Sequence, residues 1–202
     1  MKKLSILIFV LSLLISNVFA ETIEFEFEGY VDVLEENTDD GMFYMGQQFQ
    51  GSFSYCLIPD LDLGAVSYSG AYHQNASLSV MLDTANINYS DSWVFIRVYN
   101  GFPNGEDSFS FGVDAQYEEY NFTKFGIELT DSTGAVFNSD ALPTSLDLSA
   151  FDSVRFCFAG YKNGFSDWFH AEAQITKLTL IPEPCSVVLL GLGSIALLRR
   201  RR

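Results

Sequence analysis

The chain has 202 residues and a formal net charge of −15, which arises from 11 basic and 26 acidic residues. This acidic balance repels nucleic acid and anionic lipid, so neither is an expected partner. The length suits one domain with a sizeable core, accompanied by short targeting segments.

The first twenty residues have the order of a secretory signal peptide. Lys2 and Lys3 precede an apolar run at residues 4–15, and Ala20 ends the stretch with a small residue before Glu21. Cleavage is therefore expected between Ala20 and Glu21, with signal peptidase and the secretion machinery as partners. An uncleaved N-terminal anchor is the alternative.

This prediction divides the chain into a signal peptide at 1–20, an exported domain at 21–181 and a tail at 182–202. The domain holds five basic and twenty-five acidic residues, so its own net charge is −20. Such a field favours solubility and gathers cations.

Residues 21–181 show no helical periodicity; short alternating runs and turn residues fill them instead. Ile23, Phe25 and Phe27 alternate with glutamates, which predicts a strand with one wet face. Further strands are predicted at residues 48–55, 77–82, 86–89, 93–99, 108–113, 122–129, 153–158 and 171–180, with a short helical turn at 146–151. About nine or ten strands at this spacing favour an all-β fold, an antiparallel β-sandwich with jelly-roll-like connections and an aromatic-rich core.

Two cysteines lie in the exported domain, Cys56 and Cys157, and the extracytoplasmic compartment permits disulfides. Each lies between apolar or aromatic neighbours on a predicted strand, so each points away from the face that its neighbours occupy. A Cys56–Cys157 disulfide is one hypothesis, and two buried free thiols are the other.

Two kinds of binding site have candidate residues. Calcium would use the acidic loops that carry Asp39, Asp40, Asp60 and Asp62, although neither loop matches the twelve-residue calcium loop. Solvated loop acids are the simpler reading, so no cofactor is expected apart from this calcium candidate. Sugar stacking would use aromatic residues near turns, above all Trp93 and Trp168.

No catalytic constellation stands out. Only two histidines occur, His73 and His170, and neither has a Cys or His at metal-ligand spacing. No nucleophile-elbow sequence appears. The chain is therefore not expected to be an enzyme, although glycoside hydrolysis would need only two suitably separated carboxylates.

The tail begins with Pro182, Glu183 and Pro184, continues with an uncharged run at 185–198 and ends in four arginines. As a helix the run spans about 21 Å, which is short for a hydrocarbon core of about 30 Å. Snorkelling arginines close part of that gap and hold this end in the cytoplasm. The prediction is a single C-terminal transmembrane helix, with a plain anchor as the simplest role. Its apolar positions are Cys185, Leu189, Leu190, Leu192, Ile195, Leu197 and Leu198, and its charge cluster is Arg199, Arg200, Arg201 and Arg202.

This order of a Pro-Glu-Pro tripeptide, a short apolar span and a terminal arginine cluster resembles the PEP-CTERM sorting signal of Gram-negative bacteria. Two further stretches are similar to ones found in that family. One is a G-x-x-F-x-G-x-F-x-Y strand, carried by residues 46–55, and the other is residues 138–148, which include Asn138, Pro143 and Asp147.

The resemblance implies an exosortase as partner, a membrane transpeptidase thought to recognise the tripeptide and remove the tail. It also implies an inner-membrane-anchored intermediate, followed by the cell surface or extracellular matrix. The expected role is structural or adhesive and linked to exopolysaccharide and biofilm. A carbohydrate-binding module, with calcium as an aid to binding, is the alternative, and a polysaccharide-acting enzyme is the third reading.

Overall fold

The computed structural model describes residues 22–35, 41–57, 61–62, 69–83, 85–101, 104–163 and 167–182; the side chains of residues 61–62, 73–75 and 90–93 are outside the description. Its strands are β1 (Thr22–Leu34), β2 (Gln48–Cys56), β3 (Leu61–Asp62), β4 (Ser69–Leu82), β5 (Ala85–Tyr99), β6 (Asp107–Tyr117), β7 (Tyr120–Asp131), β8 (Ser153–Lys162) and β9 (Asp167–Ile181). One 3₁₀ turn, η1 (Leu148–Ala150), precedes β8 and falls within the helical turn predicted there.

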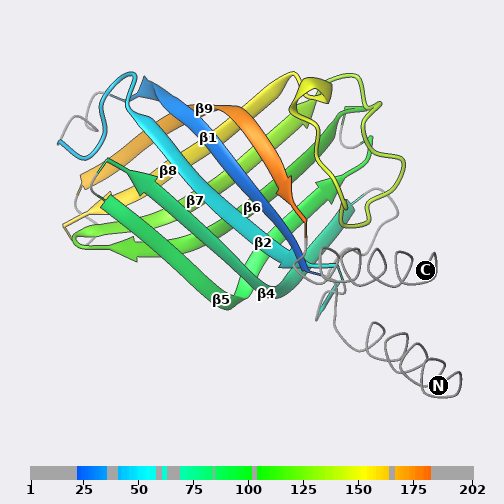
Figure 1. Cartoon of the computed structure of the whole chain (residues 1–202), viewed down its shortest axis with the longest axis horizontal. Coiled ribbons are helices and arrows are strands. Elements are labelled where there is room, and N and C mark those ends of the chain that lie inside the picture. Colours follow the sequence, from blue (N-terminus) through cyan, green and yellow to red (C-terminus); the bar gives the residue numbers. More distant parts are fainter. Residues whose placement is uncertain are drawn as a thin grey trace, which may run out of the picture.

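All the described strands belong to one antiparallel sheet, with the order β2-β1-β9-β8-β7-β6-β5-β4-β3. The sheet curls until β2 pairs with β4, from Phe49 opposite Leu82 to Tyr55 opposite Ala76. Each long strand therefore pairs with the long strands before and after it in the chain, and β9 returns to β1 (Figure 1). Closure satisfies the backbone groups that an open sheet would leave unpaired at its edges.

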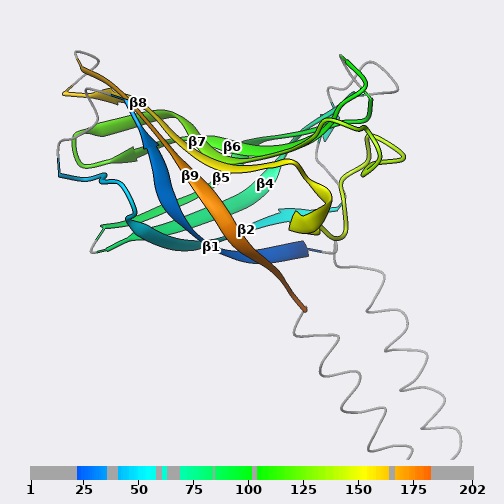
Figure 2. The ribbon, with the colours of Figure 1, turned by 90° about the horizontal axis from the view of Figure 1, so that it is seen from above.

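The structure confirms the all-β antiparallel class and changes its details. Two walls face one another across a core, as in a sandwich (Figure 2), but they are parts of one continuous sheet. Long strands that follow one another in the sequence are neighbours in the sheet, which differs from the Greek-key connections of a jelly roll. The runs predicted at 86–89 and 93–99 also join into the single strand β5, because backbone pairing continues through the polar residues between them.

Strand alternation builds an aromatic core. In β1, Phe25 and Phe27 are buried while Glu24 and Glu26 are exposed. Rings from opposite walls meet in the interior, since the Phe53 centroid of β2 lies 5.0 Å from that of Phe111 in β6. The packing is tight enough to require Gly51, because a Cβ at that position would lie 2.5 Å from the Phe27 ring. Burial of these aromatic faces supplies the main stabilisation of the fold.

The connection between β7 and β8 is held against one end of the sheet by tyrosines that belong to the core. The Tyr55 hydroxyl donates to the Pro143 carbonyl at 2.6 Å, and the Tyr72 hydroxyl donates to the Asp140 carbonyl at 2.7 Å. Residues 46–55 and 138–148, the two stretches flagged in the sequence, therefore touch through Tyr55. This contact has a structural reason: residues 46–55 include a core strand, and residues 138–148 pack on the end of that strand.

Two buried carboxylates also hold the connection between β7 and β8, near its β7 end. Asp107 accepts hydrogen bonds from the Gly101 and Phe137 N–H groups at 2.9 and 2.6 Å. Asp131 accepts from the Ala135 N–H at 2.8 Å and the Thr133 N–H at 3.0 Å. These bonds to Ala135 and Thr133 lower the pKa of Asp131, because they favour its ionised form.

Candidate functional site

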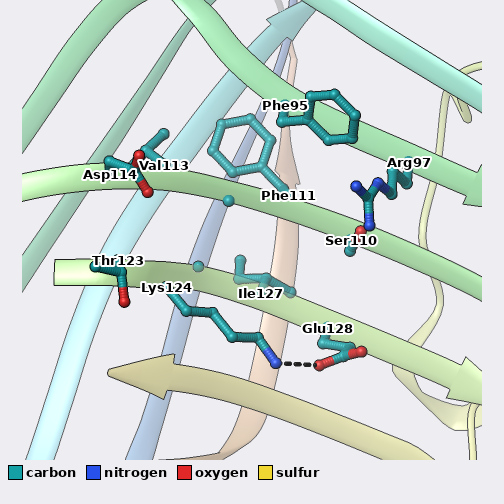
Figure 3. Close-up of a pocket in the computed structure, with 12 residues that line it drawn as sticks. Phe95, Arg97, Ser110, Phe111, Val113, Asp114, Thr123, Lys124, Ile127 and Glu128 are labelled. Carbon is teal, nitrogen blue, oxygen red and sulfur yellow. Dashed lines mark hydrogen bonds and ion pairs between the residues drawn. The ribbon is translucent and has the colours of Figure 1, made fainter. Parts of the chain in front are cut away.

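A groove of about 590 Å³ lies on the outer face of β5, β6 and β7 (Figure 3). Strand register creates it, because Phe95 pairs with Gly112 and Gly112 pairs with Gly126. Two adjacent strands thus present a glycine at the same level of the wall. Longer side chains rise on both sides of this level, Arg97 and Glu128 toward one end and Asp114 toward the other.

The two glycines have different roles. A Cβ at Gly112 would meet nothing within 4 Å, so this residue leaves the groove open without being required by its neighbours. A Cβ at Gly126 would lie 2.0 Å from the Phe111 carbonyl oxygen, so Gly126 is required for the close approach of the two backbones. Glycine within a strand weakens it, and Gly112 therefore trades local stability for an open surface.

Phe95 and Arg97 form the side of the groove along β5. The Arg97 guanidinium carbon lies 4.4 Å from the Phe95 ring centroid, within cation–π range. Arg97 is exposed, and the described residues give it no ion pair. Its N–H donors are thus oriented by the ring and remain available to a ligand, next to the Ser110 hydroxyl (Figure 3).

Lys124 and Glu128 form the long side of the groove along β7. The Lys124 ammonium donates to Glu128 at 2.9 Å, and the glycine at position 126 leaves room for the lysine stem to lie between them (Figure 3). Burial lowers the pKa of Lys124, but the hydrogen bond to Glu128 and nearby negative groups outweigh that effect and raise it. Lys124 is therefore charged at neutral pH, and the pair offers a donor and an acceptor to the groove.

The groove differs in charge from the rest of the domain. Its lining contains two of the five basic residues of the domain, Arg97 and Lys124, and two acidic residues, Asp114 and Glu128. The groove is thus formally neutral within a domain of net charge −20. Hydroxyl groups of Ser110 and Thr123 add polar atoms that both donate and accept.

A second set of charges, on the outer faces of β8, β9 and β1, is structural. The Arg155 guanidinium donates to both Asp32 carboxylate oxygens at 2.6 Å and so ties β8 to β1 across β9. This hydrogen bond raises the pKa of Arg155. The His170 ring lies between Glu35 at 2.9 Å and Glu172 at 3.4 Å, on the outer face of β9.

Trp168, predicted from the sequence to stack on sugars, lies on the outer face of β9 and is 42% exposed. Its ring meets that of Tyr161 edge-on, with centroids 5.1 Å apart. Tyr161 pairs with Asn121 of β7, so two strand spacings separate Trp168 from the β7 side of the groove. The side chain of Trp93 lies outside the described residues.

The calcium candidates also fall outside the description. Asp39, Asp40 and Asp60 are not among the described residues, and only the backbone of Asp62 is described, in β3. Within the described ranges, no group of three or more His, Cys, Asp or Glu side chains has a geometry that could hold a metal ion.

The disulfide hypothesis is not supported, because Cys56 and Cys157 are both free thiols. β9 and β1 lie between β8, which carries Cys157, and β2, which carries Cys56. Both side chains project outward, away from the core. Burial raises the pKa of the Cys157 thiol to about 11, although the positive charge of Lys124 acts in the opposite direction.

Of the targeting residues, only Pro182 is described, and it is exposed directly after β9. Ala20, Glu21 and residues 183–202 lie outside the described part, including the predicted anchor and arginine cluster. A search of the described residues for a helix with the length and apolar character to cross a membrane found none.

Comparisons of the chain with family models, with curated proteins and with solved structures gave no match. The site therefore stands on its own geometry. Sequence reasoning missed the groove, because its residues come from three strands that only the register brings together. The available signal was Gly112 and Gly126, two glycines that interrupt runs otherwise typical of strands.

Proposed function

We propose that this chain is an exported surface protein whose C-terminal tail is a PEP-CTERM-type sorting signal read by an exosortase. In this proposal the signal peptide directs export, the tail holds the intermediate in the inner membrane, and processing at Pro182-Glu183-Pro184 delivers the domain to the cell surface or extracellular matrix. There it has a structural or adhesive role linked to exopolysaccharide.

One observation carries the proposal: the sheet is complete immediately before the tripeptide. Ile181, the last residue of β9, pairs with Glu24 near the start of β1, and the exposed Pro182 follows. Proline has no N–H to continue the ladder. A cut beyond this point would therefore leave every described strand and the aromatic core intact, as removal of a sorting tail demands.

The position of the domain ends supports the same path. β1 starts at Thr22, next to the end of β9, so the sites of signal-peptide and tail processing would both leave the domain from one side. A closed sheet also exposes little unpaired strand edge, which suits a protein that must remain folded outside the cell without chaperones.

Mass spectrometry of the protein from its native host tests the proposal. We expect loss of the C-terminal peptide at or next to the tripeptide, and a variant with alanine at Pro182, Glu183 and Pro184 should keep its tail at the inner membrane. The matched control replaces Thr179, an exposed residue of β9, with alanine and should be processed normally. Wild-type protein that persists at full length in the inner membrane would reduce the proposal to a plain anchored domain.

The groove favours carbohydrate binding as a second function. It also weighs against the third reading, a polysaccharide-acting enzyme. Glu128 is paired in register with Ser110, so it lies four residues along the wall from Asp114, roughly 13 Å at strand spacing. Glycosidase carboxylates are about 5–9.5 Å apart, and these two lie at opposite ends of the groove (Figure 3).

A further inference from the structure

We propose that the groove over β5, β6 and β7 binds a neutral polysaccharide segment. This inference rests on the proposed location of the domain outside the cell, and it gives the adhesive role a site and a ligand class. The site is defined by Phe95, Arg97, Gly112, Lys124 and Glu128.

The size of the groove fits a short stretch of sugar chain. Its volume of about 590 Å³ falls within the range of roughly 300–1,000 Å³ that small ligands occupy in proteins. Its floor is open, since a Cβ at Gly112 has no neighbour within 4 Å. The groove crosses three strands that are each about 4.8 Å apart, so its floor is broad enough for rings rather than for a narrow side chain.

The polar groups fit hydroxyls. A sugar hydroxyl both donates and accepts hydrogen bonds, and it meets both kinds of partner here. Arg97 and Lys124 offer donors, while Asp114 and Glu128 offer acceptors. Phe95 and the Arg97 guanidinium, whose carbon lies 4.4 Å from the ring centroid, form the β5 side of the groove, where the C–H face of a sugar ring can pack.

The charge selects a neutral chain over an acidic one. The domain carries a net charge of −20, which repels a polyanion as it approaches. The groove has equal numbers of positive and negative lining groups, and Glu128 already neutralises Lys124 at 2.9 Å. A polyuronate would therefore find only one cation in the groove, Arg97, that is not already paired with a carboxylate. A neutral glycan would not be repelled by the negative charge of the domain.

The glycine at position 112 provides a selective test. We would screen full-length protein in mild detergent against neutral oligosaccharides of the cello-, xylo- and malto- series, with oligoalginate as the acidic comparison, and measure affinities by calorimetry. Gly112→Val places a side chain on the floor of the groove. The new Cβ would meet no atom within 4 Å, and valine favours strands, so the substitution should fill the groove without disturbing the sheet. We expect about a tenfold or greater loss of affinity from Gly112→Val, with an unfolding temperature at least as high as that of the wild type.

A matched control separates groove filling from a general effect of valine. Ser52 lies on the outer face of β2, on the opposite wall, so Ser52→Val should leave affinity unchanged. Arg97→Gln provides a second reading that leaves the floor of the groove open, and loss of its charged hydrogen bonds and of its contact with Phe95 should weaken binding by about tenfold.

The proposal would be overturned if no neutral oligosaccharide binds, if Gly112→Val and Arg97→Gln bind as the wild type does, or if oligoalginate binds more tightly than every neutral glycan. Binding that is lost only in Trp168→Ala would likewise overturn it, by moving the site to the Tyr161–Trp168 pair. These measurements do not depend on tail processing, so failure here and failure of the sorting proposal can be told apart.

Discussion

Asp107 allows a quantitative test of how the connection between β7 and β8 is held. Its side chain is fully buried at the start of β6, and its two oxygens accept from the Gly101 N–H at 2.9 Å and the Phe137 N–H at 2.6 Å. Asp107→Asn preserves the shape but replaces one acceptor oxygen with an NH₂ donor. One of the two backbone donors therefore loses its partner and faces another donor.

The expected cost follows from that single exchange. A hydrogen bond to a charged group contributes about 1.5–3 kcal/mol, so we expect a loss of about 2 kcal/mol in the free energy of unfolding. With a urea dependence of about 2 kcal/mol per molar, the unfolding midpoint should fall by about 1 M. Urea titration followed by tryptophan fluorescence and circular dichroism measures this shift.

Asp114→Asn is the matched control, because Asp114 is exposed on the same strand and its replacement removes the same single charge. Each variant removes one negative charge and so relieves charge repulsion in the acidic domain to a similar extent. The difference between their unfolding free energies therefore reports the buried hydrogen bonds of Asp107. Equal urea midpoints for the two variants would refute the reasoning. Unchanged hydrogen exchange at the amides of Gly101 and Phe137 in Asp107→Asn would show that these two hydrogen bonds are not what the substitution weakens.

Three further predictions follow from the same contacts. Backbone N–H groups lower the pKa of Asp131 in the folded protein. The stability that Asp131 contributes is therefore complete above the ordinary carboxyl pKa and is lost as the pH falls below about 4. Asp131→Asn should be less stable than the wild type at neutral pH and should lose less of its free energy of unfolding in an acid titration. Tyr55→Phe removes the donor to Pro143 and should cost about 1 kcal/mol in urea unfolding, with a loss near zero contradicting a fixed connection. With its pKa raised to about 11, Cys157 should react with iodoacetamide at pH 8 on the order of 100-fold more slowly in the folded protein than in urea, and equal rates would show an exposed thiol.

The fold class could be read from the sequence because strand alternation is local. Ile23, Phe25 and Phe27 alternate with glutamates, and the structure buries the first set and exposes the second. Turn residues marked the ends of most strands for the same reason: a glycine or asparagine at a turn acts through its own backbone preferences. The short helical turn predicted at 146–151 is local for the same reason, because the Asp147 side chain accepts a hydrogen bond from the Ser149 N–H.

Tertiary structure alone decided which strands meet. Pairing of β9 with β1, and of β2 with β4, joins segments far apart in the chain, and it is chosen by how completely the aromatic faces are buried rather than by any local preference. The same closure kept Cys56 and Cys157 apart. It also set Gly112 beside Gly126 and Phe95, so the groove exists only once the register is fixed. A sequence records each of these residues, but only the folded sheet makes them neighbours.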